Sequence, residues 1–127
     1  MDIIGIGTEI VECLRVGRMI EQHGEQFLAR VYTEREMRVC QSRRRATEQF
    51  AAYWAAKEAV LGALNRPWRQ GMEWTDIEIR EEPGAGPVVE FSGATSELAQ
   101  ALRLGRVMLS MSHCRAYATA TAIAVRG

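Results

Sequence analysis

The sequence has few cysteines, a single lysine and no net charge, and these shortages exclude several classes of protein. Its three cysteines, Cys13, Cys40 and Cys114, show no C-x-x-C spacing, so neither a disulfide framework nor a zinc site is indicated. Sixteen basic and sixteen acidic residues cancel, so no overall field attracts the chain to nucleic acid or to an anionic membrane. We therefore expect a cytoplasmic protein that binds neither nucleic acid nor membranes.

Common targeting and nucleotide-binding signals are also missing. The opening residues MDIIGIGTEI carry no basic residue before their apolar stretch, so we expect no signal peptide. The uncharged run at 116–125 is too short to span a bilayer. No G-x-G-x-x-G or Walker loop occurs, so the ordinary nucleotide-binding motifs are absent. No G-x-S-x-G elbow occurs either, which argues against a serine hydrolase built on Ser110 and His113.

The remaining features are those of one globular domain covering residues 1–127. The chain is 47% hydrophobic and 25% charged over 127 residues, which is enough for one core. Apolar spacing, caps and turns predict strands at 2–7, 75–80, 88–91, 107–113 and 116–126, and helices at 11–23, 26–32, 33–41, 44–64 and 92–104. This order predicts an α+β fold, a largely antiparallel sheet packed against a long buried helix.

Two local patterns support this prediction. Thr33 and Glu36 have the spacing of a capping box, so a helix is expected to begin there. The last predicted strand places alanines on one face, which allows a helix to approach closely. These are Ala118, Ala120, Ala122 and Ala124. The Ala-rich helix at 44–64 is the expected partner.

Lys57 and Glu58 interrupt the apolar centre of that long helix. Burying a charge is costly unless the charge is paired, hydrogen-bonded or bound to a metal. Successive helix positions point about 100° apart, so each of the two needs its own partner. One reading is that a side chain extends past its neighbours to solvent. The functional reading is that Glu58 binds a cation and Lys57 an anionic ligand.

Glu9 follows a strand punctuated by glycines. We expect it at the end of that strand, where a carboxylate can hold a hard cation such as Mg²⁺, which takes one or two carboxylates together with waters and substrate phosphates. The alternative is that Glu9 begins a helix, where an acidic side chain favours the helix dipole.

Charge is distributed unevenly along the chain. Residues 30–48 contain six arginines and three glutamates, whereas residues 73–90 contain six acidic residues and one arginine. Either these are two solvated faces, or the basic segment is a surface for an anionic partner.

Three stretches taken together resemble the holo-(acyl-carrier-protein) synthase type of 4'-phosphopantetheinyl transferase. They are IGIGTEIVE at 4–12, FAAYWAAKEAVLGAL at 50–64 and SMSHCRAYATATAI at 110–123. The resemblance implies transfer of the phosphopantetheine arm of coenzyme A to a serine of an acyl carrier protein, with release of adenosine 3',5'-bisphosphate. It also implies that Glu9 and Glu58 hold Mg²⁺, with Lys57 contacting phosphate and Glu58 as one candidate base.

Further residues receive roles from the resemblance alone. Ser112 and His113 would contact the coenzyme A nucleotide, and Gly86 and Pro87 would lie near its adenine. The resemblance also implies a homotrimer with active sites at subunit interfaces. The acidic carrier protein would be met by basic residues, because opposite charge speeds encounter. These are Arg15, Arg43, Arg44 and Arg45.

The chain departs from the family pattern at four places. The first metal ligand is Glu9 where the family usually has Asp, and Gly62 replaces a second lysine. Tyr53 replaces an arginine that would serve a coenzyme A phosphate. The loop after the long helix contains Arg66 and Arg69, which we expect to bind coenzyme A in compensation.

Two other readings stay open beside the transferase. The first is a non-catalytic relative that keeps the trimer and binds coenzyme A or a carrier protein. Gly62 and Tyr53 favour it, whereas the presence of both Glu9 and Glu58 argues against it. The second is an unrelated small α+β binding domain.

Overall fold

The fold contains five helices, five strands and one 3-10 turn within residues 2–65 and 71–127, which the computed structural model describes. The chain runs in the order β1 (Ile3–Glu12), α1 (Cys13–His23), α2 (Glu25–Val31), α3 (Glu34–Gln41), α4 (Ala46–Ala63), the 3-10 turn Trp74–Asp76, β2 (Ile77–Glu82), β3 (Gly86–Phe91), α5 (Gly93–Ala101), β4 (Leu104–His113) and β5 (Tyr117–Arg126). Within these residues no helix combines the length and apolarity needed to cross a membrane.

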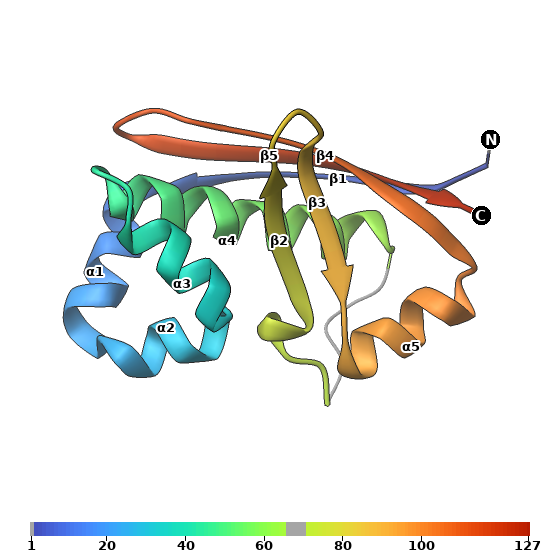
Figure 1. Cartoon of the computed structure of the whole chain (residues 1–127), viewed down its shortest axis with the longest axis horizontal. Coiled ribbons are helices and arrows are strands. Elements are labelled where there is room, and N and C mark those ends of the chain that lie inside the picture. Colours follow the sequence, from blue (N-terminus) through green and yellow to red (C-terminus); the bar gives the residue numbers. More distant parts are fainter. Residues whose placement is uncertain (1, 66–70) are drawn as a thin grey trace.

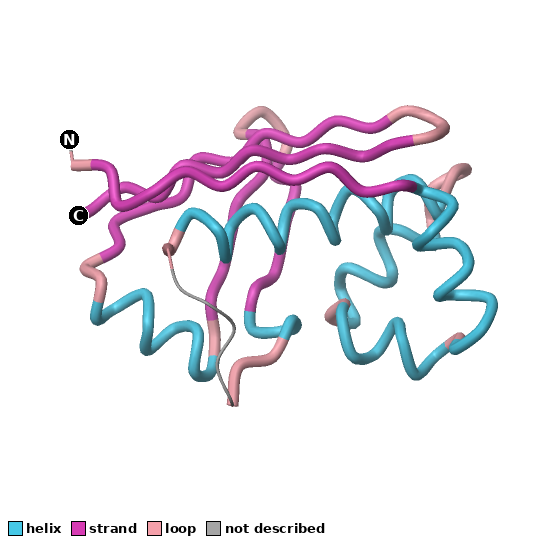
Figure 2. Tube along the Cα trace, turned by 180° about the vertical axis from the view of Figure 1, so that it is seen from behind, coloured by secondary structure: helices cyan, strands magenta, loops and turns pink. Residues whose placement is uncertain are grey.

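Helix α4 is the central layer of the molecule. An antiparallel sheet of order β1-β5-β4 lies along one side of it (Figure 1). Helices α1 and α3 and the β2–β3 hairpin, a separate two-stranded sheet, contact α4 as well (Figure 2). The predicted α+β fold is confirmed, with its antiparallel strands divided between two sheets.

Small residues let α4 approach the sheet closely. The alanines of β5 at positions 118, 120, 122 and 124 are at most 1% exposed, as their alternation predicts. On β1, a methyl group added to Gly7 would overlap the carbonyl oxygen of Ala59. The glycines of β1 therefore allow α4 to approach that strand closely, as the alanines allow it to approach β5.

The first strand is longer than predicted. It continues to Glu12 and pairs with β5 as far as Tyr117, whereas the sequence suggested a helix from position 11. Gly7, Glu9 and Val11 alternate on the side facing α4, and this period of two makes the segment a strand. Glu9 consequently lies inside β1, opposite Ala120, so the prediction that it sits at a strand end is wrong.

A buried ion pair joins the elements around α4. Lys57 and Glu36 are both 0% exposed, and Lys57 Nζ lies 2.7 Å from Glu36 Oε1. Lys57 also donates to the carbonyl oxygens of Val31 at 2.7 Å and Trp74 at 3.1 Å. The pair thereby ties α4 to α2, to α3 and to the 3-10 turn.

Glu36 has a second structural role. Its carboxylate accepts from the backbone N–H groups of Thr33 at 2.9 Å and Ile79 at 2.7 Å, so it completes the predicted capping box of α3 and holds β2. Burial raises the pKa of Glu36 and lowers the pKa of Lys57, while their mutual attraction opposes both shifts. The hydrogen bonds offset the cost of keeping both groups charged.

Replacing Lys57 by methionine should destabilise the fold by about 3–5 kcal/mol, because it leaves the Glu36 charge buried without its cation. The measurement is urea unfolding followed by circular dichroism. The double variant Lys57→Met/Glu36→Gln removes both charges and should recover part of the loss. A single variant as stable as the unmodified protein would show that the pair contributes nothing.

Candidate active site

Glu9 and Glu58 line one cavity, although they lie far apart in the sequence. Glu9 comes from the side of β1 that faces α4, and Glu58 comes from α4 itself. The cavity has a volume of ≈ 570 Å³ and is also lined by Arg15 from α1. Glu12 lines it as well, and aromatic and aliphatic side chains form the rest of its wall, among them Val11, Val16, Phe27, Trp54 and Tyr117.

The electrostatics of Glu58 reflect this setting. Burial raises its pKa, and the neighbouring charge of Glu9 raises it further. The Trp54 side chain, one helical turn earlier on α4, acts as a hydrogen-bond donor that lowers the pKa, as does the positive charge of Arg15. Two acidic groups that repel each other inside one cavity form a place where a bound cation is favoured.

The donor set fits Mg²⁺. Within residues 2–65 and 71–127 no group of three or more His, Cys, Asp or Glu side chains is placed to hold a metal ion. Two carboxylates are nevertheless enough for Mg²⁺, which keeps several waters and accepts phosphate oxygens of a substrate. A bound Mg²⁺ would supply neutralisation of phosphate charge, with Glu9 and Glu58 as its ligands.

The other predicted site residues lie away from this cavity. His113 ends β4, where its Nδ1 is 3.0 Å from Oε1 of Glu48 at the start of α4. Ser112 is exposed on the sheet face that points away from α4. Gly86 and Pro87 begin β3, with Pro87 paired to Glu81. Of the predicted residues that the structure describes, this cavity brings together Glu9, Glu58 and Arg15.

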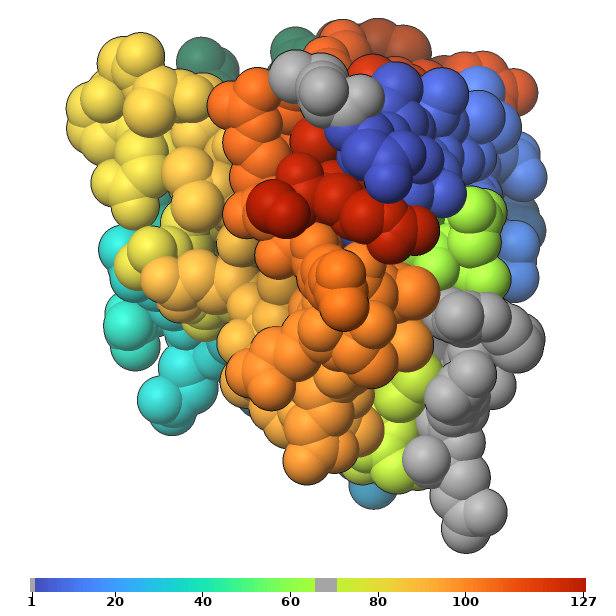
Figure 3. Space-filling view, turned by 90° about the vertical axis from the view of Figure 1, so that its right-hand side faces the viewer, coloured from blue at the N-terminus to red at the C-terminus, as the bar shows by residue number. Residues whose placement is uncertain are grey.

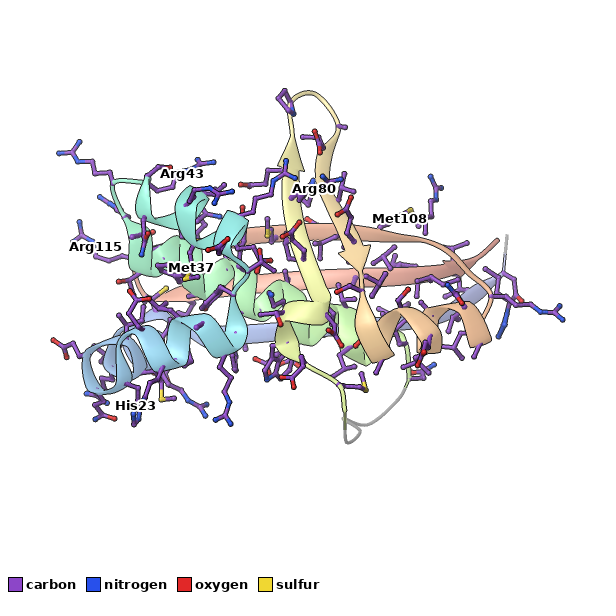
Figure 4. All side chains as sticks on the ribbon, turned by 60° about the horizontal axis from the view of Figure 1, so that its bottom comes forward. His23, Met37, Arg43, Arg80, Met108 and Arg115 are labelled. Carbon is purple, nitrogen blue, oxygen red and sulfur yellow. The ribbon has the colours of Figure 1, made fainter. Side chains whose placement is uncertain are left out.

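The consecutive arginines before α4 are also separate from the carboxylate cavity. Arg44 and Arg45 line a second cavity of ≈ 550 Å³, together with Thr47, Glu48 and Arg115. Arg43 forms an ion pair with Glu81 at 3.4 Å. Figure 4 shows Arg43 and Arg115 projecting from the same end of the molecule. This end is a basic surface, and helix α1 contributes residues to both cavities.

Lys57 requires a correction. Its fully buried ammonium group is occupied by Glu36 and two carbonyl oxygens, and it does not line the cavity of the two carboxylates. In this structure Lys57 is therefore placed as a core residue, and this geometry does not support the prediction that it contacts phosphate or takes a catalytic part. Its neighbour Glu58 points elsewhere because successive helical positions diverge by about 100°.

The departures from the family pattern have distinct structural settings. Tyr53 is buried, and its hydroxyl donates to Glu81 at 3.0 Å. Gly62 is exposed, and a Cβ atom added there would meet the backbone of Gly7 only at ordinary contact distance, so the first atom of a side chain has room. Arg66 and Arg69 lie outside the described residues.

The sequence reasoning missed Trp54 and Glu48. Trp54 lies four residues before Glu58 on a helix, a spacing that places both side chains on one face and could have revealed it. Glu48 has no comparable signal, because an acidic residue in the first turn of a helix is commonplace.

An α+β fold with two carboxylates and an arginine in one cavity defines a class of proteins whose cavity has the donors for a metal ion and a phosphate group. Sequence comparison makes the class specific. A profile described as the 4'-phosphopantetheinyl transferase superfamily matches residues 5–122, and the chain belongs to this family.

Similar proteins extend over nearly the whole chain. A holo-[acyl-carrier-protein] synthase of Rhodopirellula baltica is 48% identical over 120 residues, covering 94% of this chain and 95% of that protein. One of Koribacter versatilis is 44% identical over 121 residues, covering 95% and 97%. The crystal structure of the Neisseria meningitidis synthase is similar with a TM-score of 0.87 at 29% identity, covering 98% and 99%. That of the Bacillus anthracis synthase in complex with CoA (3',5'-ADP) has a TM-score of 0.81 at 29% identity, covering 100% of both chains.

Glu58→Gln should raise the stability of the metal-free protein and remove its stabilisation by Mg²⁺. A pKa raised in the folded state means that stability is lost as pH rises through that pKa, so the ionised side chain is unfavourable at neutral pH without a cation. Thermal unfolding at pH 7 with and without Mg²⁺ measures both effects. In the unmodified protein, Mg²⁺ at about 100 times its Kd should add about 2.7 kcal/mol.

Glu12→Gln is the matched control, because Glu12 lines the same cavity but lies on the opposite face of β1 from Glu9 and Val11 by strand alternation. It should keep the response to Mg²⁺. Equal stabilisation of Glu58→Gln and the unmodified protein by Mg²⁺ would contradict the metal site.

Proposed function

We propose that the protein transfers the 4'-phosphopantetheine arm of coenzyme A to a serine of an apo acyl carrier protein in a Mg²⁺-dependent reaction, releasing adenosine 3',5'-bisphosphate. The observation that carries this proposal is the meeting of Glu9 and Glu58 in one cavity with Arg15. Family membership supports it, as do relatives named holo-[acyl-carrier-protein] synthase. Similar structures hold coenzyme A or its 3',5'-ADP part.

The few charged groups in the cavity are suited to the proposed transfer reaction. The serine oxygen forms a bond to the phosphorus nearest the pantetheine, and the bond from that phosphorus to the bridging oxygen breaks. Such phosphoryl transfer needs mainly positioning and charge neutralisation. Glu9 and Glu58 would hold the metal, and Arg15 adds a positive charge near the anionic group. The serine proton passes to water or to a carboxylate such as Glu58.

The apolar wall of the cavity contributes by restricting water. Trp54 packs against Phe27 with ring centroids 5.8 Å apart and against Trp74 at 5.1 Å. A less hydrated cavity strengthens the attraction between its charged groups and a bound phosphate. Because Trp54 is held on both sides, the surface beside Glu58 is well defined.

We also propose a homotrimer in which each site is completed by a neighbouring subunit. One chain places Glu9 and Glu58 in one cavity and His113, Gly86 and Pro87 elsewhere, so a single chain does not surround coenzyme A with all the expected residues. The sheet face opposite α4 exposes a row of apolar side chains. In this row Ile6 on β1 and Met108 on β4 both pair with Ile123 on β5.

The exposures support this assignment. Ile6 is 61% exposed, Ile10 64% and Met108 36%. Exposed apolar side chains that lie side by side across three strands are typical of a surface that another protein covers. We assign it to a second copy of the chain, because that arrangement brings an additional set of ligand-binding residues to each cavity.

The acidic carrier protein is expected to meet Arg15 and the basic end formed by Arg43, Arg44 and Arg45. Arg15 lines the carboxylate cavity itself, so a carrier protein bound there would present its serine close to the metal. Since coenzyme A and carrier proteins of lipid or polyketide synthesis are the substrates, we place the protein in the cytoplasm.

Incubation with coenzyme A, Mg²⁺ and an apo acyl carrier protein tests the activity. The carrier should gain the mass of one phosphopantetheine arm, measured by mass spectrometry, and a carrier with its serine replaced by alanine should gain none. Tight coenzyme A binding without mass gain would instead favour the non-catalytic relative, to which Gly62 and Tyr53 point.

Ile6→Lys should dissociate the trimer, because it places a charge within the exposed apolar row. Light scattering should then report the mass of one chain, and transfer activity should fall at least about tenfold. Leu14→Lys is the control, since Leu14 is 63% exposed but lies on α1. A trimer that persists in Ile6→Lys would exclude this face as the interface.

A further inference from the structure

Glu48 and His113 form a hydrogen-bonded pair that none of the roles above explains. His113 is the last residue of β4, and Glu48 lies in the first turn of α4. His113 Nδ1 is 3.0 Å from Glu48 Oε1, with the carboxylate side chain 11% exposed and the imidazole 36%. The carboxylate is thus the more buried member, while the imidazole reaches the surface.

The chemistry of the pair determines where the imidazole proton lies. An ionised carboxylate only accepts hydrogen bonds, so the shared hydrogen must belong to Nδ1 of His113. In a neutral ring the other nitrogen, Nε2, then carries the lone pair, and in a protonated ring it donates. In both states the ring is held in one orientation, because Nδ1 is fixed on Glu48.

The surroundings of Glu48 are basic. Its other oxygen, Oε2, is 3.5 Å from Arg45, and Glu48 lines the second cavity with Arg44, Arg45 and Arg115. An anionic ligand would be attracted to this end of the molecule.

We propose that Glu48 is a positioning residue that fixes His113 in the Nδ1–H tautomer and turns its Nε2 toward a phosphate of coenzyme A. The inference rests on the proposed function, in which His113 contacts coenzyme A. Carboxylates that orient an imidazole through its second nitrogen are a recurring device at functional sites. Here the device joins α4 to the end of β4.

A purely structural role for Glu48 would look different. An acidic side chain in the first helical turn is favoured by the helix dipole even when it is exposed. Glu48 is instead only 9% exposed as a residue, and it is bonded to a side chain from another element. Both observations indicate a specific partner for this carboxylate.

Nitrogen-15 NMR of the two histidine rings tests the tautomer. When its ring is neutral, His113 should be mainly in the Nδ1–H form. In Glu48→Gln this form should lose its dominance, because an amide can either donate or accept. His23, the other histidine, lies on the outside of α1 (Figure 4) and serves as the internal reference.

Arg45→Gln is the matched control, because it removes the other partner of the Glu48 carboxylate without touching His113. It should leave the His113 tautomer unchanged. If Glu48→Gln does not fold, Glu48→Asp withdraws the carboxylate by one methylene and should show the same loss of the Nδ1–H form. A His113 ring that stays Nδ1–H in whichever Glu48 variant folds would overturn the proposal.

Calorimetric titration of coenzyme A in the presence of Mg²⁺ tests the link to the ligand. Glu48→Gln should bind about fivefold or more weakly, the effect of losing one well-oriented hydrogen bond. In a His113→Gln background the same substitution should have little further effect, because Glu48 acts through the ring. An undiminished effect in that background would contradict the positioning role.

The failure of this inference can be told apart from failure of the proposed function. If His113→Gln binds coenzyme A as tightly as the unmodified protein while transfer to the carrier continues, the positioning of His113 toward the ligand is wrong and the enzyme assignment stands. If the unmodified protein transfers no phosphopantetheine arm, the proposed function is wrong.

Discussion

The buried contact between Lys57 and Glu36 is the interaction on which the rest of the structure depends. It joins the middle of α4 to the beginning of α3, and its hydrogen bonds reach the end of α2, the 3-10 turn and β2. Apolar contacts alone would hold these elements with little directional preference. Charged groups in the interior require their partners at defined positions, so this pair fixes how the helices and the hairpin are arranged around α4.

The position of α4 in turn determines the carboxylate cavity. Gly7 and the alanines of β5 leave no side-chain bulk between helix and sheet, so α4 lies close to β1. Glu9 is directed toward the helix by strand alternation, and Glu58 faces the same space from α4. Two carboxylates from distant parts of the chain can meet only because the intervening residues are so small. The glycines of β1 therefore serve the carboxylate cavity as well as the packing.

Much of this arrangement could be predicted from the sequence. The alanine face of β5 and the Thr33–Glu36 capping box are local patterns, and both are confirmed. The extent of β1 was not predictable in the same way. Its glycines and Glu9 lower strand propensity, and the strand persists through pairing with β5, which is a contact between the two ends of the chain. Figure 3 shows these ends side by side.

The site was predictable only where a residue's direction follows from local spacing. Resemblance placed Glu9 and Glu58 together, and the structure agrees that they share a cavity. It also placed Lys57 beside the phosphate, because neighbours in sequence suggest neighbours in space. On a helix this inference fails, since the partner that occupies Lys57 is a glutamate from α3, and nothing near position 57 indicates it. A single sequence does not show which distant residues pair when their charges are buried.

The spacing within α4 explains why its motif is arranged as it is. Tyr53 faces Glu81 on the hairpin, Trp54 and Glu58 face the carboxylate cavity, and Lys57 faces the core. Positions 54 and 58 are about one helical turn apart, and position 57 is rotated from 58 by about 100°. Inserting one residue between Lys57 and Glu58 would rotate one of the two side chains by about 100°. Either Glu58 would then point away from Glu9, or Lys57 would face an apolar wall. The adjacent Lys57 and Glu58 therefore have two different places, one in the core and one in the wall of the cavity, and the geometry of the helix separates them.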